Sequence, residues 1–253
     1  MSLYRVEAIA LKHFPLGERD KIVTFFTRER GKLRAVANNV RHMRSNLSGT
    51  VELFTHSRLL IYQGKSLARI NKCQLMESFI SLREDLKRMA YASYISELVH
   101  EFSQEEDRNE GLFLLLLATM HLLVEREEAQ LAVITRIFEL RALGLLGFQP
   151  LLEECAHCGQ GLIEEKTAGF SFSQGGVICR QCKGELRDKL HPLSAGSLKM
   201  MKRLIRADYR RLNVLKLPAY AANELKSLLS GYLEYSLERE LKSKKFLDLM
   251  EQE

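Results

Sequence analysis

The first 80 residues alternate short apolar runs with polar turn clusters. The runs are rich in Val, Ile, Leu, Thr, Phe and Tyr, and they cover residues 6–14, 21–26, 32–38, 51–63 and 67–79. Clusters such as PLGERD, NNVRHMRSNLSG and QGKS separate them. Five short strands without an intervening helix predict a small barrel. The strand count fits the five-stranded oligonucleotide/oligosaccharide-binding barrel (OB-fold), and an SH3-like barrel is the alternative.

After residue 80 the apolar positions change to helical spacing. Leu82, Leu86, Tyr94 and Leu98 lie on one face of a predicted helix over 81–102, with Ser81 as its N-cap and Glu84 completing a capping box. Further helices are predicted after residue 110 and after residue 193. We therefore predict an α+β protein with four segments: an OB-fold domain (1–80), a first helical part (81–150), an insert (151–184) and a C-terminal helical part (185–253).

The longest apolar stretch, residues 111–124, is too short to span a bilayer, which needs about 20 apolar residues. The opening MSLYRVEAIALKHF lacks the basic and then apolar layout of a secretory signal. We therefore expect a cytoplasmic protein without a membrane partner, whose cysteines are kept reduced.

Four of the five cysteines form two C-x-x-C pairs at Cys155, Cys158, Cys179 and Cys182. Two such knuckles bring four thiolates to one tetrahedral ion, and the segment between them reads as a β-hairpin. Disulfides, a redox motif and an iron–sulfur site are the alternatives, and the paired knuckles favour zinc. The insert over residues 151–184 is therefore predicted to be a zinc ribbon. Four thiolates complete the coordination shell, so we expect one structural Zn²⁺ without a catalytic water. His157 offers an alternative ligand.

Positive charge is concentrated in the first third of the chain. The whole chain carries a net charge of +6, whereas residues 1–80 hold 14 lysines and arginines against six acidic residues, a net charge of +8. Such an asymmetry indicates a surface that binds an acidic polymer, most often nucleic acid.

Alternation along the predicted strand 32–38 places Lys32 and Arg34 on one face. Loops and a neighbouring hairpin add further candidates for phosphate contacts, namely Arg41, Arg44, Lys65 and Arg69. Phe25, Phe26, Phe54 and Tyr62 are candidates for stacking on bases, with burial in the barrel as the alternative role. We expect salt-dependent binding with weak sequence preference.

No catalytic constellation is visible in the sequence. The QGKS turn lacks the first glycine of a P-loop, whose position is held by Leu59, and neither H-E-x-x-H nor G-x-S-x-G occurs. The acidic clusters fall on predicted loops and helix ends. We therefore predict a protein that is not an enzyme and has no catalytic residues.

The segment ALKHFPLGERDKIVTFFTRERGKLRAVANNVRHMRS resembles the N-terminus of the bacterial RecO family of recombination mediators. The order of basic barrel, helical domain and CxxC…GFSFSQGGVICRQC ribbon is also similar to that family, so the resemblance covers essentially the whole chain.

The resemblance implies a non-enzymatic role in DNA repair by the RecF pathway. It implies binding of single- and double-stranded DNA and annealing of complementary strands. It also implies action with RecR, indirectly with RecF, to load RecA onto strands coated by single-strand-binding protein, at the bacterial nucleoid. The family further implies that the barrel cations contact DNA and that the four ribbon cysteines hold zinc. A zinc-ribbon RNA-binding or transcription-associated adaptor is the alternative.

Overall fold

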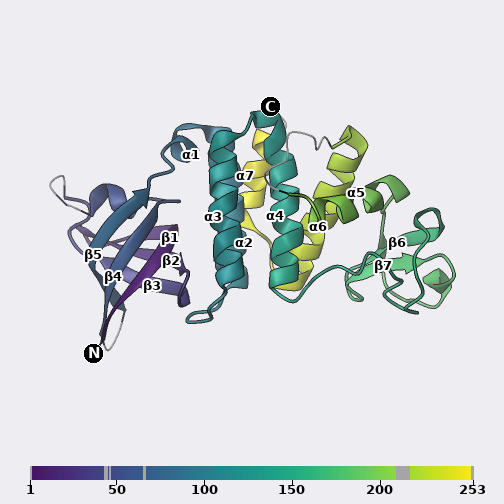
Figure 1. Ribbon diagram of the computed structural model, residues 1–253, viewed down its shortest axis with the longest axis horizontal. Coiled ribbons are helices and arrows are strands. Elements are labelled where there is room, and N and C mark those ends of the chain that lie inside the picture. The colour runs from purple at the N-terminus through teal and green to yellow at the C-terminus, as the bar shows by residue number, and fades with distance from the viewer. Residues whose placement is uncertain (1, 43–44, 46, 65–66, 209–216, 252–253) are drawn as a thin grey trace. The chain divides into compact units, whose positions relative to one another are not determined.

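The predicted strands of the N-terminal region are present in the computed structural model, which describes residues 2–42, 45, 47–64, 67–208 and 217–251. They form a closed barrel in the order β1-β2-β3-β5-β4 (Figure 1). All neighbours are antiparallel except β3 and β5. This five-stranded OB-like barrel confirms the predicted fold of the region. The strands are β1 (Ser2–Leu16), β2 (Asp20–Thr27), β3 (Gly31–Ala37), β4 (His56–Gln63) and β5 (Ala68–Glu77).

Side-chain alternation builds the barrel interior. In β3, Leu33 and Ala35 belong to the buried core, while Lys32 and Arg34 point outward, as the sequence predicts. Phe25 of β2 and Leu59 of β4 fill the same interior. The barrel interior is therefore filled by side chains, so a ligand has to bind on the outer surface.

Strand β4 begins later than its apolar run predicts. Residues 51–55 form a turn, in which Phe54 is buried with a φ of 69°. The Thr55 hydroxyl donates to the carbonyl oxygens of Glu52 at 2.7 Å and Thr50 at 3.2 Å. The prediction of a strand from Val51 is wrong for these residues because the side-chain hydrogen bonds close a local turn.

Two compact units divide the chain: Met1–Arg126 with Leu241–Glu253, and Glu127–Glu240. The first unit adds four helices to the barrel among the residues that the structure describes: α1 (Ser81–Glu84), α2 (Leu86–Phe102), α3 (Glu110–Glu125) and α7 (Lys242–Met250). Helix α7 packs on α2, where the Glu97 carboxylate accepts from the Ser243 backbone N–H at 2.7 Å. The Tyr91 hydroxyl also donates to Glu251 at 2.7 Å.

The predicted capping box at Ser81 is wrong. Helix α1 ends at Glu84 and has no side-chain cap, and the long helix begins only at Leu86. Asp85 is extended, and its Oδ1 accepts from the Arg88 N–H at 2.9 Å. Ser81 and Asp85 are both good N-cap residues, so the sequence does not decide between them.

Helix α3 is the longest apolar stretch of the sequence. Leu112, Phe113, Leu116, Met120 and Leu123 are each no more than 1% exposed, which makes α3 a core helix of its unit.

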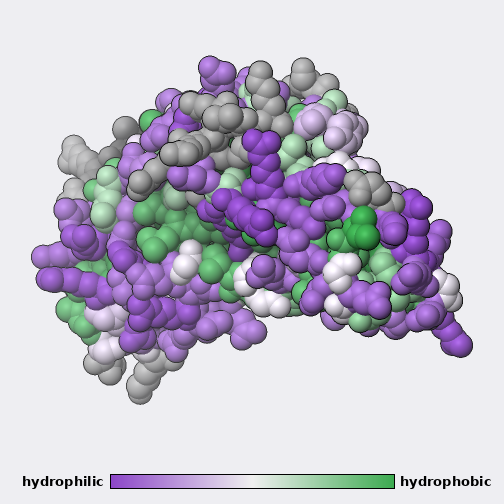
Figure 2. Space-filling view, turned by 45° about the vertical axis from the view of Figure 1, so that its right-hand side comes forward, coloured by the Kyte–Doolittle hydropathy of each residue, from purple (hydrophilic) through white to green (hydrophobic). Residues whose placement is uncertain are grey.

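No helix of the described residues has both the length and the apolar character needed to cross a membrane. The face drawn in Figure 2 is mainly hydrophilic, with its hydrophobic residues in separate patches.

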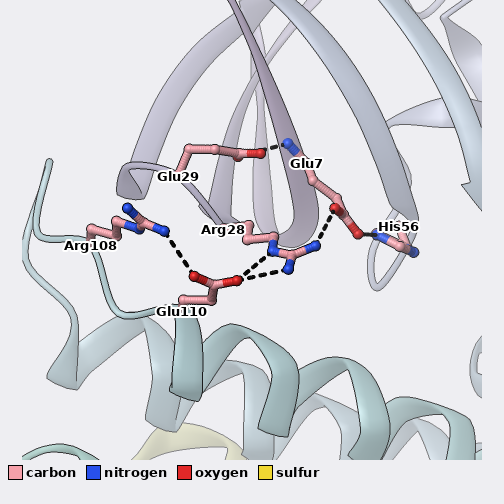
Figure 3. A network of polar contacts seen from close by, with 6 residues as sticks. All are labelled: Glu7, Arg28, Glu29, His56, Arg108 and Glu110. Atoms are coloured by element: carbon pink, nitrogen blue, oxygen red, sulfur yellow. Dashed lines mark hydrogen bonds and ion pairs between the residues drawn. The ribbon is translucent and has the colours of Figure 1, made fainter.

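A network of polar side chains joins the barrel to the start of α3 (Figure 3). The Arg28 guanidinium donates to Glu110 at 2.7 and 2.9 Å and to Glu7 at 3.3 Å. The other Glu7 oxygen lies 2.8 Å from Nε2 of His56. Hydrogen bonds to Arg28 and Arg108 lower the pKa of the Glu110 carboxyl, so its contribution to stability is present above the unfolded pKa and is lost as pH falls.

Gly31 begins β3 in a left-handed conformation, with a φ of 66°. A Cβ at this position would lie 1.8 Å from the backbone oxygen of Asp107, because the loop before α3 crosses β3 here. We expect Gly31→Ala to lower the free energy of unfolding of the first unit by about 2–4 kcal/mol, from left-handed strain and overpacking. The urea-unfolding midpoint measures this loss. Gly49→Ala is the control, because a Cβ at Gly49 meets nothing within 4 Å. Equal effects of the two substitutions would contradict the close crossing.

The second unit combines a ribbon with three helices among its described residues. The ribbon strands β6 (Thr167–Ser171), β7 (Gly176–Cys179) and β8 (Leu190–His191) form a sheet in the order β7-β6-β8. The helices α4 (Leu131–Leu145), α5 (Ala195–Ile205) and α6 (Ala219–Leu237) pack on one another. Short 3₁₀ turns complete both units at Ser48–Thr50, Glu128–Gln130, Glu164–Lys166 and Cys182–Gly184.

Candidate metal centre and candidate nucleic-acid interface

The four cysteines of the C-x-x-C pairs converge in the ribbon. The sulfur atoms of Cys155, Cys158, Cys179 and Cys182 all lie within 4.8 Å of one another. Cys155 and Cys182 are buried, Cys158 is exposed, and none of the four is in a disulfide. This donor set fits a metal ion that prefers four thiolate ligands.

The backbone of the ribbon shapes both knuckles. The first knuckle turns back through Gly159, whose φ is 71° and whose N–H donates to the Cys155 carbonyl at 2.9 Å. The second knuckle follows β7, which pairs with β6 as the predicted hairpin. The Cys179 N–H lies 3.4 Å from the Cys155 sulfur and joins the two knuckles. The hairpin therefore holds the ligands together through main-chain contacts.

The electrostatics of the quartet favour a cation. Burial acts to raise the pKa of the Cys155 thiol, but hydrogen bonds from the backbone N–H groups of Cys179, Cys158 and His157 outweigh it and lower that pKa to about 6. Burial and the neighbouring sulfurs raise the pKa of the Cys182 thiol. Four thiolates without a cation therefore repel one another, and a bound metal ion would relieve that repulsion.

His157, the alternative ligand, lies beside the quartet. Its Nε2 is 3.2 Å from a carboxylate oxygen of Glu185. Atoms of His157, Glu185 and Cys182 also lie within 4.8 Å of one another. Since four sulfurs are already together, His157 with its Glu185 partner borders the cysteine quartet and is not needed as a ligand.

Aromatic side chains attach the ribbon to helix α6. The ring of Phe170 in β6 meets Tyr232 edge-on, with centroids 5.2 Å apart. Phe172 stacks on His191 at 3.6 Å and also contacts Tyr232. The Tyr232 hydroxyl donates to the Phe148 carbonyl at 3.2 Å. Loss of the ribbon would therefore expose apolar surface on α6.

The predicted DNA-contacting cations occupy different environments on the barrel. Arg34 and Arg69 are exposed, and within the described residues neither side chain makes an ion pair or a hydrogen bond. Arg41 is exposed and donates to the Gly17 carbonyl at 3.1 Å. The Lys32 ammonium donates to the His100 carbonyl of α2 at 2.8 Å, so this side chain also holds barrel and helix together. Arg44 and Lys65 lie outside the described residues.

Three of the four aromatic stacking candidates are buried. Phe25 lies in the barrel core, and Phe54 is covered in the turn before β4. Phe26 points outward from β2, but Phe113 of α3 covers it, with ring centroids 6.4 Å apart. For these three the alternative role holds, because packing buries each side chain and leaves no ring face open to a base. Tyr62 alone of the four remains partly exposed.

Three outward-facing cations escaped the sequence reasoning. Arg5, Arg58 and Lys72 come from β1, β4 and β5 and line one groove on the barrel surface. Arg5 precedes the first apolar run, and Arg58 and Lys72 fall in two different runs, so the sequence shows no cluster of the three. Alternation within the strands, combined with the pairing register, would have found them.

Comparison with known protein families bears on the choice between a DNA repair protein and an RNA-binding adaptor, which the geometry of the site leaves open. The model described as "Recombination protein O N terminal" matches residues 1–79, and the model described as "Recombination protein O C terminal" matches residues 83–245. The chain belongs to the recombination protein O family. The predicted resemblance to RecO is thereby confirmed over both the barrel and the helical and ribbon region.

Proteins named "DNA repair protein RecO" are similar along nearly the whole chain. The protein from Symbiobacterium thermophilum is 40% identical over 252 residues, which is 99% of this chain and 98% of that protein. The protein from Pelotomaculum thermopropionicum is 39% identical over 248 residues, 98% of this chain and 94% of that protein. Membership of the RecO family supports a role in DNA repair and favours it over an RNA-binding adaptor.

Proposed function

We propose that this RecO-family chain is a non-enzymatic recombination mediator. It binds single- and double-stranded DNA through the barrel and anneals complementary strands. It acts with RecR, and indirectly with RecF, to load RecA onto strands coated by single-strand-binding protein at the bacterial nucleoid, in the cytoplasm. The observation that carries this proposal is the family match over both halves of the chain, joined to a barrel whose outward cations remain available for phosphates.

The proposed DNA surface consists of the cations around β3, namely Lys32, Arg34, Arg41, Arg44, Lys65 and Arg69. Arg34 and Arg41 are the strongest candidates for phosphate contacts, because both are exposed and their guanidinium groups suit phosphate oxygens. We expect Lys32 to contribute less to the DNA affinity, since its ammonium already donates to the His100 carbonyl. Because three of the four candidate aromatic side chains are buried, stacking on bases should contribute little. Phosphate contacts should therefore dominate the affinity for DNA.

The proposed metal is one structural Zn²⁺ held by the four ribbon cysteines. Four convergent sulfurs around a hairpin support zinc, which takes tetrahedral thiolate sites, and they leave no open position for a substrate or water. The metal would hold the two knuckles together, while the barrel would bind DNA.

We expect Arg34→Gln/Arg41→Gln to weaken binding of a single-stranded oligonucleotide and to slow annealing at low salt. The slope of log affinity against log salt should become shallower by about 1.4, since each single-strand phosphate contact contributes about 0.7. Fluorescence anisotropy over a salt series measures the slope, and a labelled-strand assay without ATP measures annealing.

Arg187→Gln/Lys189→Gln is the matched control, because it removes the same charge from exposed positions in the other unit. Failure of the unsubstituted protein to bind DNA or to accelerate annealing would refute the proposed function. Competition between single-stranded DNA and RNA of the same sequence tests the choice of nucleic acid, and a clear preference for RNA would refute it as well.

A further inference from the structure

A cationic groove runs across the outer face of β1, β4 and β5. Its volume is about 470 Å³, and its lining includes Arg5, Arg58, Leu60, Lys72 and Gln74. The strand register places Arg5, Leu60 and Lys72 in one row across the three strands, and Arg58 and Gln74 in the next row. The three cations therefore share one surface, although the sequence separates them.

The cations of this groove are not neutralised within the structure. Arg5, Arg58 and Lys72 are exposed, and across the described part of the chain none of their side chains makes a hydrogen bond or ion pair. Glu7 lies directly opposite Arg58 across β1 and β4 and is the acidic residue of that row. Both of its carboxylate oxygens are already used, one beside His56 and the other beside Arg28 (Figure 3).

Arg58 lies diagonally from Arg5 on one neighbouring strand and from Lys72 on the other. The three like charges therefore concentrate positive potential on one surface, which attracts a ligand with negative charge. Arg5 and Lys72 are separated by two strand spacings, or about 10 Å between backbones, and Arg58 lies one row, about 7 Å, along the strands. A single phosphate is too small to contact all three, whereas an extended chain of phosphates can. Guanidinium groups bind phosphate oxygens in pairs, which suits this ligand.

The groove is separate from the Arg34 side of the barrel. Strand β3 meets the strands of the groove only at β5, where Ala35 and Val36 pair in parallel with Ala68 and Arg69. Arg34 lies two residues before Val36, and Lys72 lies three residues after Arg69, so these two cations are five positions apart along the strands. Arg69 of β5 pairs with both β3 and β4 and lies between the two surfaces. A phosphate chain seated on Arg5, Arg58 and Lys72 would therefore leave Arg34 and Arg41 free for a second one.

We propose that the β1–β4–β5 groove is a second binding surface for the phosphate backbone of DNA, so that one barrel holds two strands at once. This inference rests on the proposed function and deepens it, because annealing requires both strands to be held near each other. The groove contacts phosphates through Arg5, Arg58 and Lys72 and reads no base sequence.

The test uses the full chain with Arg58→Gln/Lys72→Gln, and Arg187→Gln/Lys189→Gln as the control of equal charge. The probe is a labelled single strand of about 30 nucleotides, longer than one barrel's usual site. We expect the salt slope of the groove variant to become shallower by about 1.4, with about half that change for Arg5→Gln alone. In a chain that combines the groove variant with Arg34→Gln, the two changes in salt slope should add. Uptake of a second, non-complementary strand by the first complex should fall most, and annealing should slow with it.

Each outcome decides the question. An unchanged slope and unchanged second-strand uptake in the groove variant, with the unsubstituted protein still binding DNA, would overturn the groove and leave the proposed function intact. Absence of DNA binding by the unsubstituted protein would overturn both. Equal losses in the groove variant and the control would reduce the effect to net charge and overturn the groove. Loss of binding to polyglutamate without loss of DNA binding would assign the groove to an acidic protein partner instead. Circular dichroism confirms that the variants fold, since their substituted side chains are exposed.

Discussion

Replacing Cys179 with alanine is expected to abolish stoichiometric zinc binding, from about one ion per chain to a small fraction of one. The substitution leaves three of the four convergent sulfurs, so the coordination shell stays incomplete. Structural zinc contributes about 10–16 kcal/mol of apparent binding free energy in small zinc-finger peptides, so the ribbon should lose most of its stability. Metal analysis of the purified protein by plasma mass spectrometry measures the first effect, and limited proteolysis of residues 151–191 measures the second.

Cys73→Ala is the matched control for this experiment. Cys73 is a partly buried thiol packed against the barrel core, with its sulfur 3.6 Å from the Thr50 carbonyl. Burial raises the pKa of this thiol, which makes it a poor metal ligand. We expect the control to retain its zinc. Full retention of zinc in Cys179→Ala would contradict the four-thiolate assignment, as would loss of zinc in Cys73→Ala.

Loss of the metal should spread from the ribbon to the helices of its own unit. Phe170 and Phe172 pack on Tyr232 of α6, so an unfolded ribbon exposes that helix face to water. The barrel has its own core, and we therefore expect DNA binding to fall less than the stability of the second unit. Chelation of the metal followed by a DNA-binding titration would measure this difference.

Local sequence patterns predicted the features that depend on neighbouring residues. The C-x-x-C spacing was sufficient for the quartet because each knuckle is a short turn and the hairpin between them is continuous in sequence. Alternation in β3 likewise placed Lys32 and Arg34 outward, since that periodicity is a property of the strand itself. These parts of the fold and of the cysteine quartet could therefore be predicted from the sequence.

Features that depend on distant packing could not be predicted in this way. Alternation shows that Phe26 points out of the barrel, but only the fold shows that Phe113 covers it. The Lys32 ammonium finds its acceptor 68 residues away in α2, and the sequence gives no sign of that contact. The same holds for the groove, because its three cations meet only through the register of β1, β4 and β5.

Removing the Glu139 carboxylate of helix α4 is expected to lower the free energy of unfolding of the second unit. Arg136 and Glu139 lie one turn apart in α4, and Nη1 of Arg136 is 3.1 Å from Oε2 of Glu139. Their side chains are only 3% and 0% exposed. Glu139→Ala leaves the Arg136 charge buried without this partner, which costs about 3–5 kcal/mol in comparable buried pairs. Hydrogen exchange at the α4 amides measures the loss locally, which matters because a chain of two units need not unfold in one step.

Two further variants separate charge from packing in this pair. Glu153→Ala removes a carboxylate that is 61% exposed and contacts Lys202 at 2.9 Å, so we expect a cost below about 1 kcal/mol. Arg136→Met/Glu139→Leu removes both buried charges and should restore most of the stability, because apolar side chains of similar size can replace a buried pair. If Glu139→Ala were as mild as Glu153→Ala, water would have to reach the pair, and the burial of α4 against α6 would be refuted. If the double variant were less stable than Glu139→Ala, the Arg136 side chain would stabilise α4 even without Glu139, and the hydrogen bond from Arg136 to the Lys226 carbonyl, which only the double variant removes, would account for the difference.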